Sequence, residues 1–196
     1  HLLLSGSPGC GKSTISFILA KSINCDSMYI NASDENSIDT VRDKIKNFAS
    51  SVGFRNLKIV ILDEADFCTV NALASLRALM ENFSQSTRFI LTCNYKEKII
   101  PAIISRCQTF ELVPPSKKDV ALHVSNILKK ENVQYTPQDI KLIIDSMYPD
   151  IRRIINTLQL QTSDGKLQID KQAMLDADYK IKVLEILQKN MKKLFL

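Results

Sequence analysis

A stretch near the start of the chain, Gly6 to Ser13, has the residue types and the spacing that bind a triphosphate. It reads Gly-Ser-Pro-Gly-Cys-Gly-Lys-Ser and fits the phosphate-binding pattern G-x-x-x-x-G-K-[ST]. Its glycines let the backbone bend closely around phosphate oxygens, with amide N–H groups pointing at them. Lys12 adds a positive charge for the β- and γ-phosphates, and the Ser13 hydroxyl is a ligand for Mg²⁺. The predicted nucleotide-binding residues are Gly6, Ser7, Pro8, Gly9, Cys10, Gly11, Lys12, Ser13 and Thr14.

Two adjacent acids, Asp63 and Glu64, would supply the second half of such a site. They follow a continuous apolar run, Leu57 to Leu62, which is typical of a buried parallel strand. Asp63 would hold Mg²⁺ directly or through water, and Glu64 would orient and polarise the attacking water. An acidic pair after a strand is usually a solvated loop when it occurs alone. Downstream of a phosphate-binding loop, the pair predicts a site that binds ATP and Mg²⁺ and hydrolyses the ATP.

Strands and helices alternate along the part of the chain that must position these residues. Such alternation indicates a parallel sheet covered by helices on both faces, so the predicted fold class is α/β with five parallel strands. Strands are expected at residues 2–4, 27–31, 57–62, 88–93 and 109–113, and helices at 13–23, 38–51, 70–83 and, as a short piece, 99–105.

The pair Pro114-Pro115 predicts a domain boundary, because neither residue can continue a strand ladder or a helix interior. Helical patterns follow at 117–131, 137–147, 151–162 and 179–196. We therefore expect an ATPase domain over 1–113, a small all-helical lid domain over 114–165, and the start of a helical C-terminal region over 166–196. His1 stands beside a core strand and Leu196 within a helical pattern, so we expect a fragment of a longer protein.

The composition is that of an ordinary globular protein, with 45% apolar and 24% charged residues, and the net charge of +5 permits a nucleic-acid partner. No apolar run approaches the ~18 residues of a membrane span, so no membrane partner is expected. The cysteines are odd in number, widely spread and without a C-x-x-C pair. They indicate free thiols in a reducing intracellular compartment (cytoplasm, nucleus or, for a viral protein, host cytoplasm) rather than disulfides or a zinc site. They are Cys10, Cys25, Cys68, Cys93 and Cys107.

Taken together, the motifs resemble those of AAA+ ATPases. The full set is similar to the small subunits of sliding-clamp loaders, the replication factor C family, including its phage members. The resemblance covers about residues 1–162, and its most family-specific part is Ser-Arg-Cys at 105–107. The matching stretches are 1–6 with the loop to Ser13, 31–34 followed by 38–42, 63–66, 75–77 with Met80 and Glu81, 92–94, 105–107 and 149–153.

The resemblance implies roles for three further residues. Asn94, at a strand end, would position water near the γ-phosphate, with a strand-end turn cap as the alternative. Arg106 would act in trans, as an arginine finger on the ATP of a neighbouring subunit, with a local surface ion pair as the alternative. Arg152 would close the lid onto the γ-phosphate of its own subunit. Arg153, which faces about 100° away on the same helix, is the competing choice.

Clamp loaders follow the backbone of duplex DNA with helix N-termini and scattered basic residues. Two departures from the family pattern lie near the relevant helices and bear on how DNA binding couples to hydrolysis. Glu35-Asn36-Ser37 stands where a basic residue is frequent, and Leu73 stands where glutamine is frequent. The DNA-binding candidates, with ordinary solvated helix charge as the alternative, are Arg42, Lys44, Lys46 and Arg77.

The implied function is that of an ATP-hydrolysing subunit that opens a sliding clamp and loads it onto primer–template DNA. The implied partners are the other clamp-loader subunits in a ring of five, the clamp and the DNA. One alternative is another DNA-associated AAA+ ATPase (an initiator, a branch-migration helicase or a checkpoint loader), against which Ser-Arg-Cys argues. A second is a non-hydrolysing scaffold subunit, against which the intact Lys12, Asp63 and Glu64 argue. A small-molecule kinase would need acceptor-binding and lid motifs that the sequence does not contain.

Overall fold

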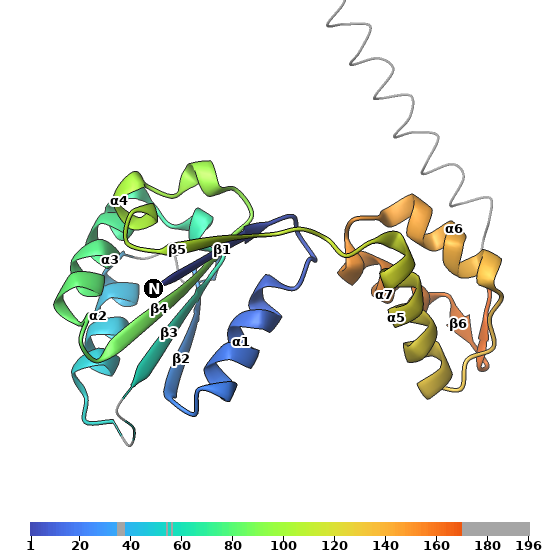
Figure 1. The fold of residues 1–196 in the computed structure, drawn as a ribbon, viewed down its shortest axis with the longest axis horizontal. Helices are drawn as coiled ribbons and strands as arrows, with labels where there is room; N and C mark the ends of the chain where they lie inside the picture. The colour runs from blue at the N-terminus through green and yellow to red at the C-terminus, as the bar shows by residue number, and fades with distance from the viewer. Residues whose placement is uncertain (35–37, 54, 56, 170–196) are drawn as a thin grey trace, which may run out of the picture. The chain divides into compact units, whose positions relative to one another are not determined.

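The computed structural model describes residues 1–34, 38–53, 55 and 57–169, with only the backbone for 38–41. The chain divides into two compact units, one from His1 to Val113 and one that starts at Pro114 (Figure 1). The stretch 35–37 and the helical pattern expected at 179–196 lie outside the described residues. Among the described residues, none of the helices combines the length and the apolar character that crossing a membrane requires.

The first unit is built on a sheet of five strands in the order β2-β3-β4-β1-β5, and every pairing is parallel. The predicted α/β fold class with a five-stranded parallel sheet is therefore confirmed. β4 lies between β1 and β3, which brings the carboxyl ends of these strands side by side. The strands are β1 (Leu2–Gly6), β2 (Asp26–Asn31), β3 (Lys58–Asp63), β4 (Thr87–Cys93) and β5 (Gln108–Leu112).

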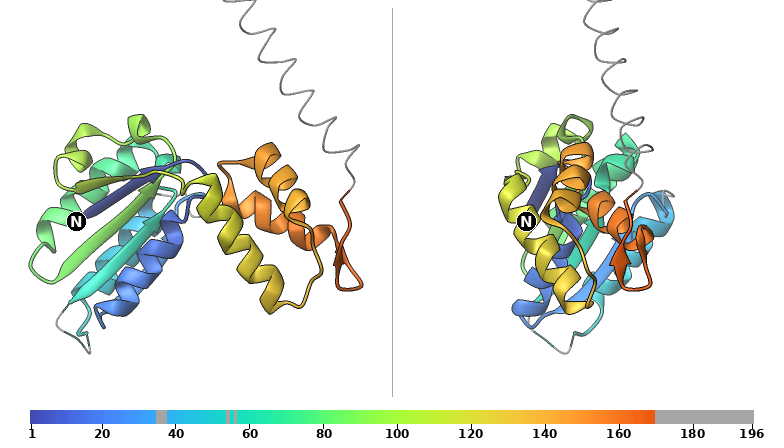
Figure 2. Two further views of the ribbon diagram at one scale, coloured as in Figure 1. Left: turned by 45° about the vertical axis from the view of Figure 1, so that its right-hand side comes forward. Right: turned by 90° about the vertical axis from the view of Figure 1, so that its right-hand side faces the viewer.

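Helices cover both faces of the sheet because the central strands are apolar on both faces. In β3, Ile59 and Ile61 pack on the face covered by α1, whereas Val60 and Leu62 pack on the face covered by α2, α3 and α4. The two layers are visible on either side of the sheet in Figures 1 and 2. The helices are α1 (Lys12–Ser22), α2 (Ile38–Ser50), α3 (Val70–Asn82) and α4 (Pro101–Ile104), with short 3₁₀ turns η1 (Ala65–Phe67) and η2 (Lys96–Lys98).

The second unit packs three helices around an apolar core that includes Val124, Ile143 and Ile154, all fully buried. Each helix begins at a polar cap. Ser116 and Asp150 accept hydrogen bonds from backbone N–H groups of the first turn, and Thr136 forms a capping box with Asp139. The helices are α5 (Lys117–Lys130), α6 (Pro137–Met147) and α7 (Ile151–Leu160), close to the predicted ranges.

A short hairpin, β6 (Thr162–Ser163) with β7 (Lys166–Leu167), adds strand to a lid that the sequence pattern predicted as all-helical. Asp164 and Gly165 form its turn with φ of 51° and 72°, and this sequence and geometry are typical of tight hairpins. Strands of two residues are too short to give an alternating pattern of apolar and polar residues, so the sequence pattern did not predict them. The boundary expected after Gly165 falls inside the hairpin, and Leu167 packs on the core of the second unit, so this packing continues past Gly165.

Candidate active site

The residues predicted to bind and hydrolyse a nucleotide meet at the carboxyl edge of the sheet. β1 runs into the glycine-rich loop at Gly6, β3 ends at Asp63, and β4 ends immediately before Asn94. Because β4 is the neighbour of both β1 and β3, the loop, the acidic pair and Asn94 lie at adjacent strand ends. Ligands of open parallel sheets bind at this edge.

The glycine-rich loop has a shape that only glycine permits at its ends. A Cβ on Gly6 would lie 2.6 Å from the backbone oxygen of Leu112, so the loop and β5 approach too closely for any side chain. Gly11 has φ 95° and begins α1 without a side-chain cap, which leaves the first N–H groups of the helix for an anion. The Ser7 hydroxyl is buried without a partner among the described residues. These features fit a bound phosphate.

Lys12 joins the loop to Asn94. Its ammonium group donates to the backbone oxygens of Gly6 and Ser7, both at 2.9 Å, and to Asn94 Oδ1 at 2.8 Å. A lysine has three donors, which these three oxygens can occupy, and Cys10 Sγ is a longer contact at 3.9 Å. A bound phosphate would therefore compete for Lys12 with these protein oxygens, and the amide oxygen of Asn94 is one of them.

Asp63 is held at both carboxylate oxygens. Oδ1 accepts from Ser13 Oγ at 2.8 Å and from the hydroxyl of Thr92, and Oδ2 accepts from Tyr29 Oη at 3.1 Å. The residue is only 7% exposed, and these bonds compensate for the burial of its charge. The pKa of Tyr29 is raised to about 12, mainly by burial and further by the negative charge of Asp63 and the hydrogen bond to it. Tyr29 therefore keeps the proton that it donates.

The hydroxyl and carboxylate oxygens of Ser13 and Asp63 are hard donors of the kind that Mg²⁺ prefers. Among the described residues, no group of three or more His, Cys, Asp or Glu could hold a metal by itself. Mg²⁺ is usually bound through one or two carboxylates together with substrate phosphates, so this small donor set fits a Mg²⁺–nucleotide complex. When bound, the ion would neutralise charge that develops on the phosphates.

Glu64 has a left-handed backbone, φ 55° and ψ 42°, which is uncommon for a residue other than glycine. Its N–H donates to Thr92 Oγ1 at 3.0 Å, and its backbone oxygen accepts from the Phe67 N–H at 2.9 Å. Strain of this kind costs about 1–3 kcal/mol and persists where the surroundings fix the residue. The backbone of Glu64 is therefore fixed at the strand end beside Asp63, and its role in orienting water stays a prediction.

Sequence reasoning missed Tyr29 and Thr92, which organise the acidic pair from the neighbouring strands β2 and β4. Thr92 is fully buried, and its hydroxyl links Asp63 to the backbone of Glu64. The available signal was Thr92, a polar residue directly after the apolar run Phe89 to Leu91. The order of the strands, which decides whether that residue faces Asp63, could not be derived from the pattern.

Arg106 follows α4 and makes the local ion pair that we gave as the alternative to an arginine finger. Its guanidinium group bonds Glu81 of α3 and donates to the backbone oxygen of Ala102 at 2.7 Å. Glu81 also accepts from Arg77 Nε at 3.3 Å. The bonds from Arg106 and then from Arg77 lower the pKa of the Glu81 carboxyl. Within the part of the chain that the structure describes, Arg106 contacts this cluster rather than the loop or the acidic pair, and its role in trans stays a prediction.

Arg152 belongs to the second unit and lies exposed in the first turn of α7, as does Arg153. The backbone N–H of Arg153 donates to the cap residue Asp150 at 3.0 Å. Both guanidinium groups are thus carried by a well-capped helix start, and the choice of Arg152 over Arg153 stays a prediction.

The DNA-binding candidates fall into separate places on the first unit. Arg42 and Lys46 line a groove of about 420 Å³ between α2 and α3, together with residues of α3 that include Ser75 and Asn82. Asp43 also lines this groove and pairs with Arg42 at 3.3 Å. Lys44 is exposed on α2, two residues away from each of them, and so lies on a different face of the helix. Arg77 is exposed on α3, where it contacts Glu81. Leu73, the departure from the family pattern, is fully buried in the core.

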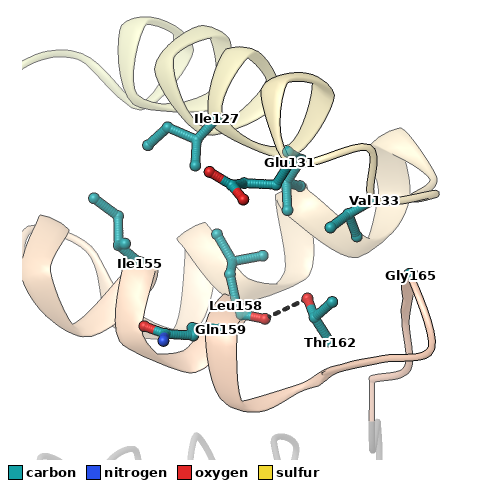
Figure 3. A pocket seen from close by; sticks show the side chains of 9 residues that line it. Ile127, Glu131, Val133, Ile155, Leu158, Gln159, Thr162 and Gly165 are labelled. Atoms are coloured by element: carbon teal, nitrogen blue, oxygen red, sulfur yellow. Dashed lines mark hydrogen bonds between the residues drawn. The ribbon is translucent and has the colours of Figure 1, made fainter.

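A separate cavity of about 560 Å³ lies in the second unit between α5, α7 and the hairpin (Figure 3). Ile127, Ile155 and Leu158 give it apolar walls, and Glu131 also lines it. Its lining, taken over the described residues, contains none of the predicted site residues.

The five cysteines are free, and burial raises the pKa of the Cys68 and Cys93 thiols to about 11, which keeps them protonated.

Known proteins resemble the chain in sequence and in fold. Over 177 residues it is 40% identical to the replication factor C small subunit of Sulfolobus acidocaldarius, which covers 87% of the chain and 54% of the relative. The corresponding protein of Halobacterium salinarum is 43% identical over 171 residues, or 84% of the chain and 53% of the relative. The chain thus spans about half the length of these curated relatives.

Two further comparisons concern the fold and the family. A solved structure of a RuvB variant from Thermotoga maritima has a TM-score of 0.71 over 90% of the chain and 60% of its own length, with 16% sequence identity, so the likeness is one of fold. The family described as "ATPase family associated with various cellular activities (AAA)" matches residues 2–115, which carry the glycine-rich loop, the acidic pair and Asn94. The match covers more than half of the chain, so the chain belongs to the AAA family of ATPases.

Proposed function

We propose that this chain is the ATPase and lid part of a small subunit of a DNA sliding-clamp loader. The observation that carries the proposal is the connected network at the sheet edge, in which Lys12 bonds Asn94 and Ser13 bonds Asp63. It joins phosphate-binding, metal-binding and water-positioning side chains at one place. The similarity to replication factor C small subunits supports the choice of clamp loading among AAA functions.

The residues of the site divide the work of hydrolysis. N–H groups of the loop and the Lys12 ammonium bind the phosphates, and Ser13 with Asp63 holds the Mg²⁺. Glu64 accepts a hydrogen bond from the water that attacks the γ-phosphorus, while the bond from that phosphorus to the ADP oxygen breaks. Asn94, released from Lys12 when phosphate takes its place, is free to orient that water. The products are ADP and phosphate.

Two arginines complete the composite site. Arg106 serves the ATP of a neighbouring subunit, for which it has to exchange its bonds to Glu81 for phosphate oxygens. Arg152 contacts the γ-phosphate of its own subunit and so couples the lid to the state of the nucleotide. The proposed assembly is a ring of five subunits in which each interface joins the loop of one subunit to the Arg106 of the next.

The assembled ring would use ATP to control a clamp on DNA. ATP binding orders the ring, which opens the sliding clamp and holds primer–template DNA through the basic residues of α2 and α3. Hydrolysis then releases the clamp onto the DNA. The basic side chains that line the α2–α3 groove, Arg42 and Lys46, are the proposed phosphate contacts, since such contacts position duplex DNA without reading its sequence.

The test is an ATPase assay on the whole protein with its partner subunits. We expect turnover to rise when primed DNA and the clamp are both added, and to rise less with either alone. Turnover that responds to DNA but not to the clamp would assign the chain to another DNA-associated AAA machine. An intact ring that binds ATP without turnover would identify a scaffold subunit instead.

A further inference from the structure

Tyr29 lies on the edge strand β2 and reaches the carboxylate to which the proposed function assigns Mg²⁺. β2 pairs with β3 in parallel register, with Asn31 opposite Asp63, so Tyr29 stands two residues upstream of that pair. Its hydroxyl donates to Asp63 Oδ2 at 3.1 Å. We propose that Tyr29 is a positioning residue that holds the Asp63 carboxylate in the orientation that takes up the divalent cation. This inference rests on the proposed nucleotide function.

The count of hydrogen bonds at Asp63 supports a positioning role. A carboxylate oxygen has two lone pairs, and Oδ1 uses both for the hydroxyls of Ser13 and Thr92. Among the described residues, Oδ2 accepts one bond, from Tyr29, which leaves its second lone pair for a cation or for a water on that cation. Bonds at both oxygens resist rotation of the carboxylate about its Cβ–Cγ bond. The Tyr29 hydroxyl thus fixes the oxygen that has capacity left.

The ring of Tyr29 is held by the helix that carries Ser13. Phe17 of α1 packs against it with ring centroids 5.0 Å apart, and Phe17 is one helical turn beyond Ser13. Tyr29 is 44% exposed and Phe17 is 47% exposed, so neither ring is a core residue. Because both rings are partly exposed, the pair adds little to the core. Its effect is to keep the Tyr29 hydroxyl directed at the buried Asp63 carboxylate, as a positioning role requires.

The Tyr29→Phe variant keeps the ring and removes only the donor. Loss of groups that orient metal ligands costs about 10–100-fold in metal affinity. Because Tyr29 is half exposed, water can replace its hydroxyl in part, and we expect the low end of that range, about tenfold. Phe17→Leu leaves the hydroxyl in place but loosens the ring, so it is expected to have a smaller effect in the same direction.

The experiment measures Mn²⁺ binding to the whole protein in the presence of ADP by electron paramagnetic resonance, with ADP affinity in EDTA as a second readout. For Tyr29→Phe we expect Mn²⁺ affinity to fall about tenfold, in line with the loss of an orienting group, and metal-free ADP affinity to stay unchanged. Tyr135→Phe, which removes a hydroxyl from the lid core, is the matched control and is expected to match the wild type in both.

The outcomes separate this proposal from the proposed function. A wild-type protein that binds no Mn²⁺ with ADP would overturn both. A wild-type protein that binds Mn²⁺, together with unchanged affinity in Tyr29→Phe, would overturn the role of Tyr29 alone. An equal loss of ADP affinity with and without metal would also overturn it, because Tyr29 would then act on the loop. If Tyr29→Phe does not fold, the same readouts on Phe17→Leu decide: a selective loss of Mn²⁺ affinity supports the proposal and an unchanged affinity refutes it.

Discussion

Two clusters of charged side chains on the first unit are built in different ways. At the sheet edge, Asp63 is 7% exposed and accepts three hydroxyl donors from α1, β2 and β4. Glu81 of α3 and Arg106, which follows α4, form an ion pair whose side chains are 42% and 33% exposed. Groups in both clusters have more than one partner, but those of Asp63 are shielded from solvent, whereas solvent or a phosphate can replace those of Glu81 and Arg106.

The difference corresponds to the proposed division between a site that acts in cis and a finger that acts in trans. A group that must be ready before the nucleotide arrives gains from fixed partners in a buried network. A group that must move to another subunit's phosphate gains from a weak partner, and solvent screening makes exposed ion pairs weak. The contrast therefore predicts that mutations in the two clusters differ in where the defect appears and in how much stability they remove.

The largest expected effect is that of Arg106→Ala. In a ring that mixes mutant and wild-type subunits, hydrolysis should fall by roughly 10³-fold or more at the neighbouring site, since an arginine finger contributes about 10³–10⁵ in rate. The mutant subunit's own site should continue to turn over. Single-turnover assays on rings with one labelled mutant subunit would measure this, with the exposed Arg88→Ala as the control. Loss of hydrolysis at the mutant subunit's own site would mean that Arg106 acts in cis. The two clusters would then not differ in which subunit's ATP they serve.

The next effect is that of Glu64→Gln, which keeps the shape of the side chain but removes the charge that polarises water. Turnover should fall by about 10²–10⁴-fold, the usual contribution of a positioned base, and ATP affinity should stay unchanged. Equilibrium binding and steady-state hydrolysis on the assembled protein separate the two quantities. Glu97→Gln, on the exposed turn η2, should behave as the wild type. Undiminished turnover in Glu64→Gln would refute the role assigned to Glu64.

A smaller effect, on stability, is expected for Thr92→Val. The side chain is fully buried, and the change would leave the Glu64 N–H and one bond of Asp63 without a partner. An unsatisfied buried polar group costs about 1–3 kcal/mol, so urea unfolding of the first unit should show a loss of that order. Thr87→Val, in the same strand and equally buried, should cost less because its hydroxyl contact to Ser86 is long, at 3.4 Å. If the two variants lost the same free energy of unfolding, the bonds of Thr92 to Asp63 and Glu64 would contribute no more stability than the hydroxyl of Thr87.

Parts of this contrast could be predicted from the sequence and parts could not. The loop from Gly6 to Ser13 and the acids after β3 are local patterns, whose chemistry depends on neighbours in the chain. Tyr29 and Thr92 reach Asp63 only because β2 and β4 flank β3, and strand order is set by tertiary packing rather than by any local pattern. The Arg106–Glu81 pair likewise joins residues 25 positions apart. Motifs therefore predicted the candidate site residues, whereas the groups that contact Asp63 from neighbouring strands could be found only from the fold.

The smallest expected effect, Glu81→Gln, tests the weak side of the comparison. The pKa of Glu81 is lowered in the folded protein, so the ion pair adds stability above the unfolded carboxyl pKa of about 4.3 and loses it as pH falls through the lower folded value. Because the pair is exposed to solvent, we expect urea unfolding at pH 7 to differ little between wild type and variant, and any difference to vanish in acid. Asp145→Asn, which breaks the exposed pair with Lys117, is the matched control. A marked loss of stability from Glu81→Gln at pH 7 would mean that the pair fixes Arg106 in place, and a finger that must leave Glu81 for a phosphate could not then be released easily.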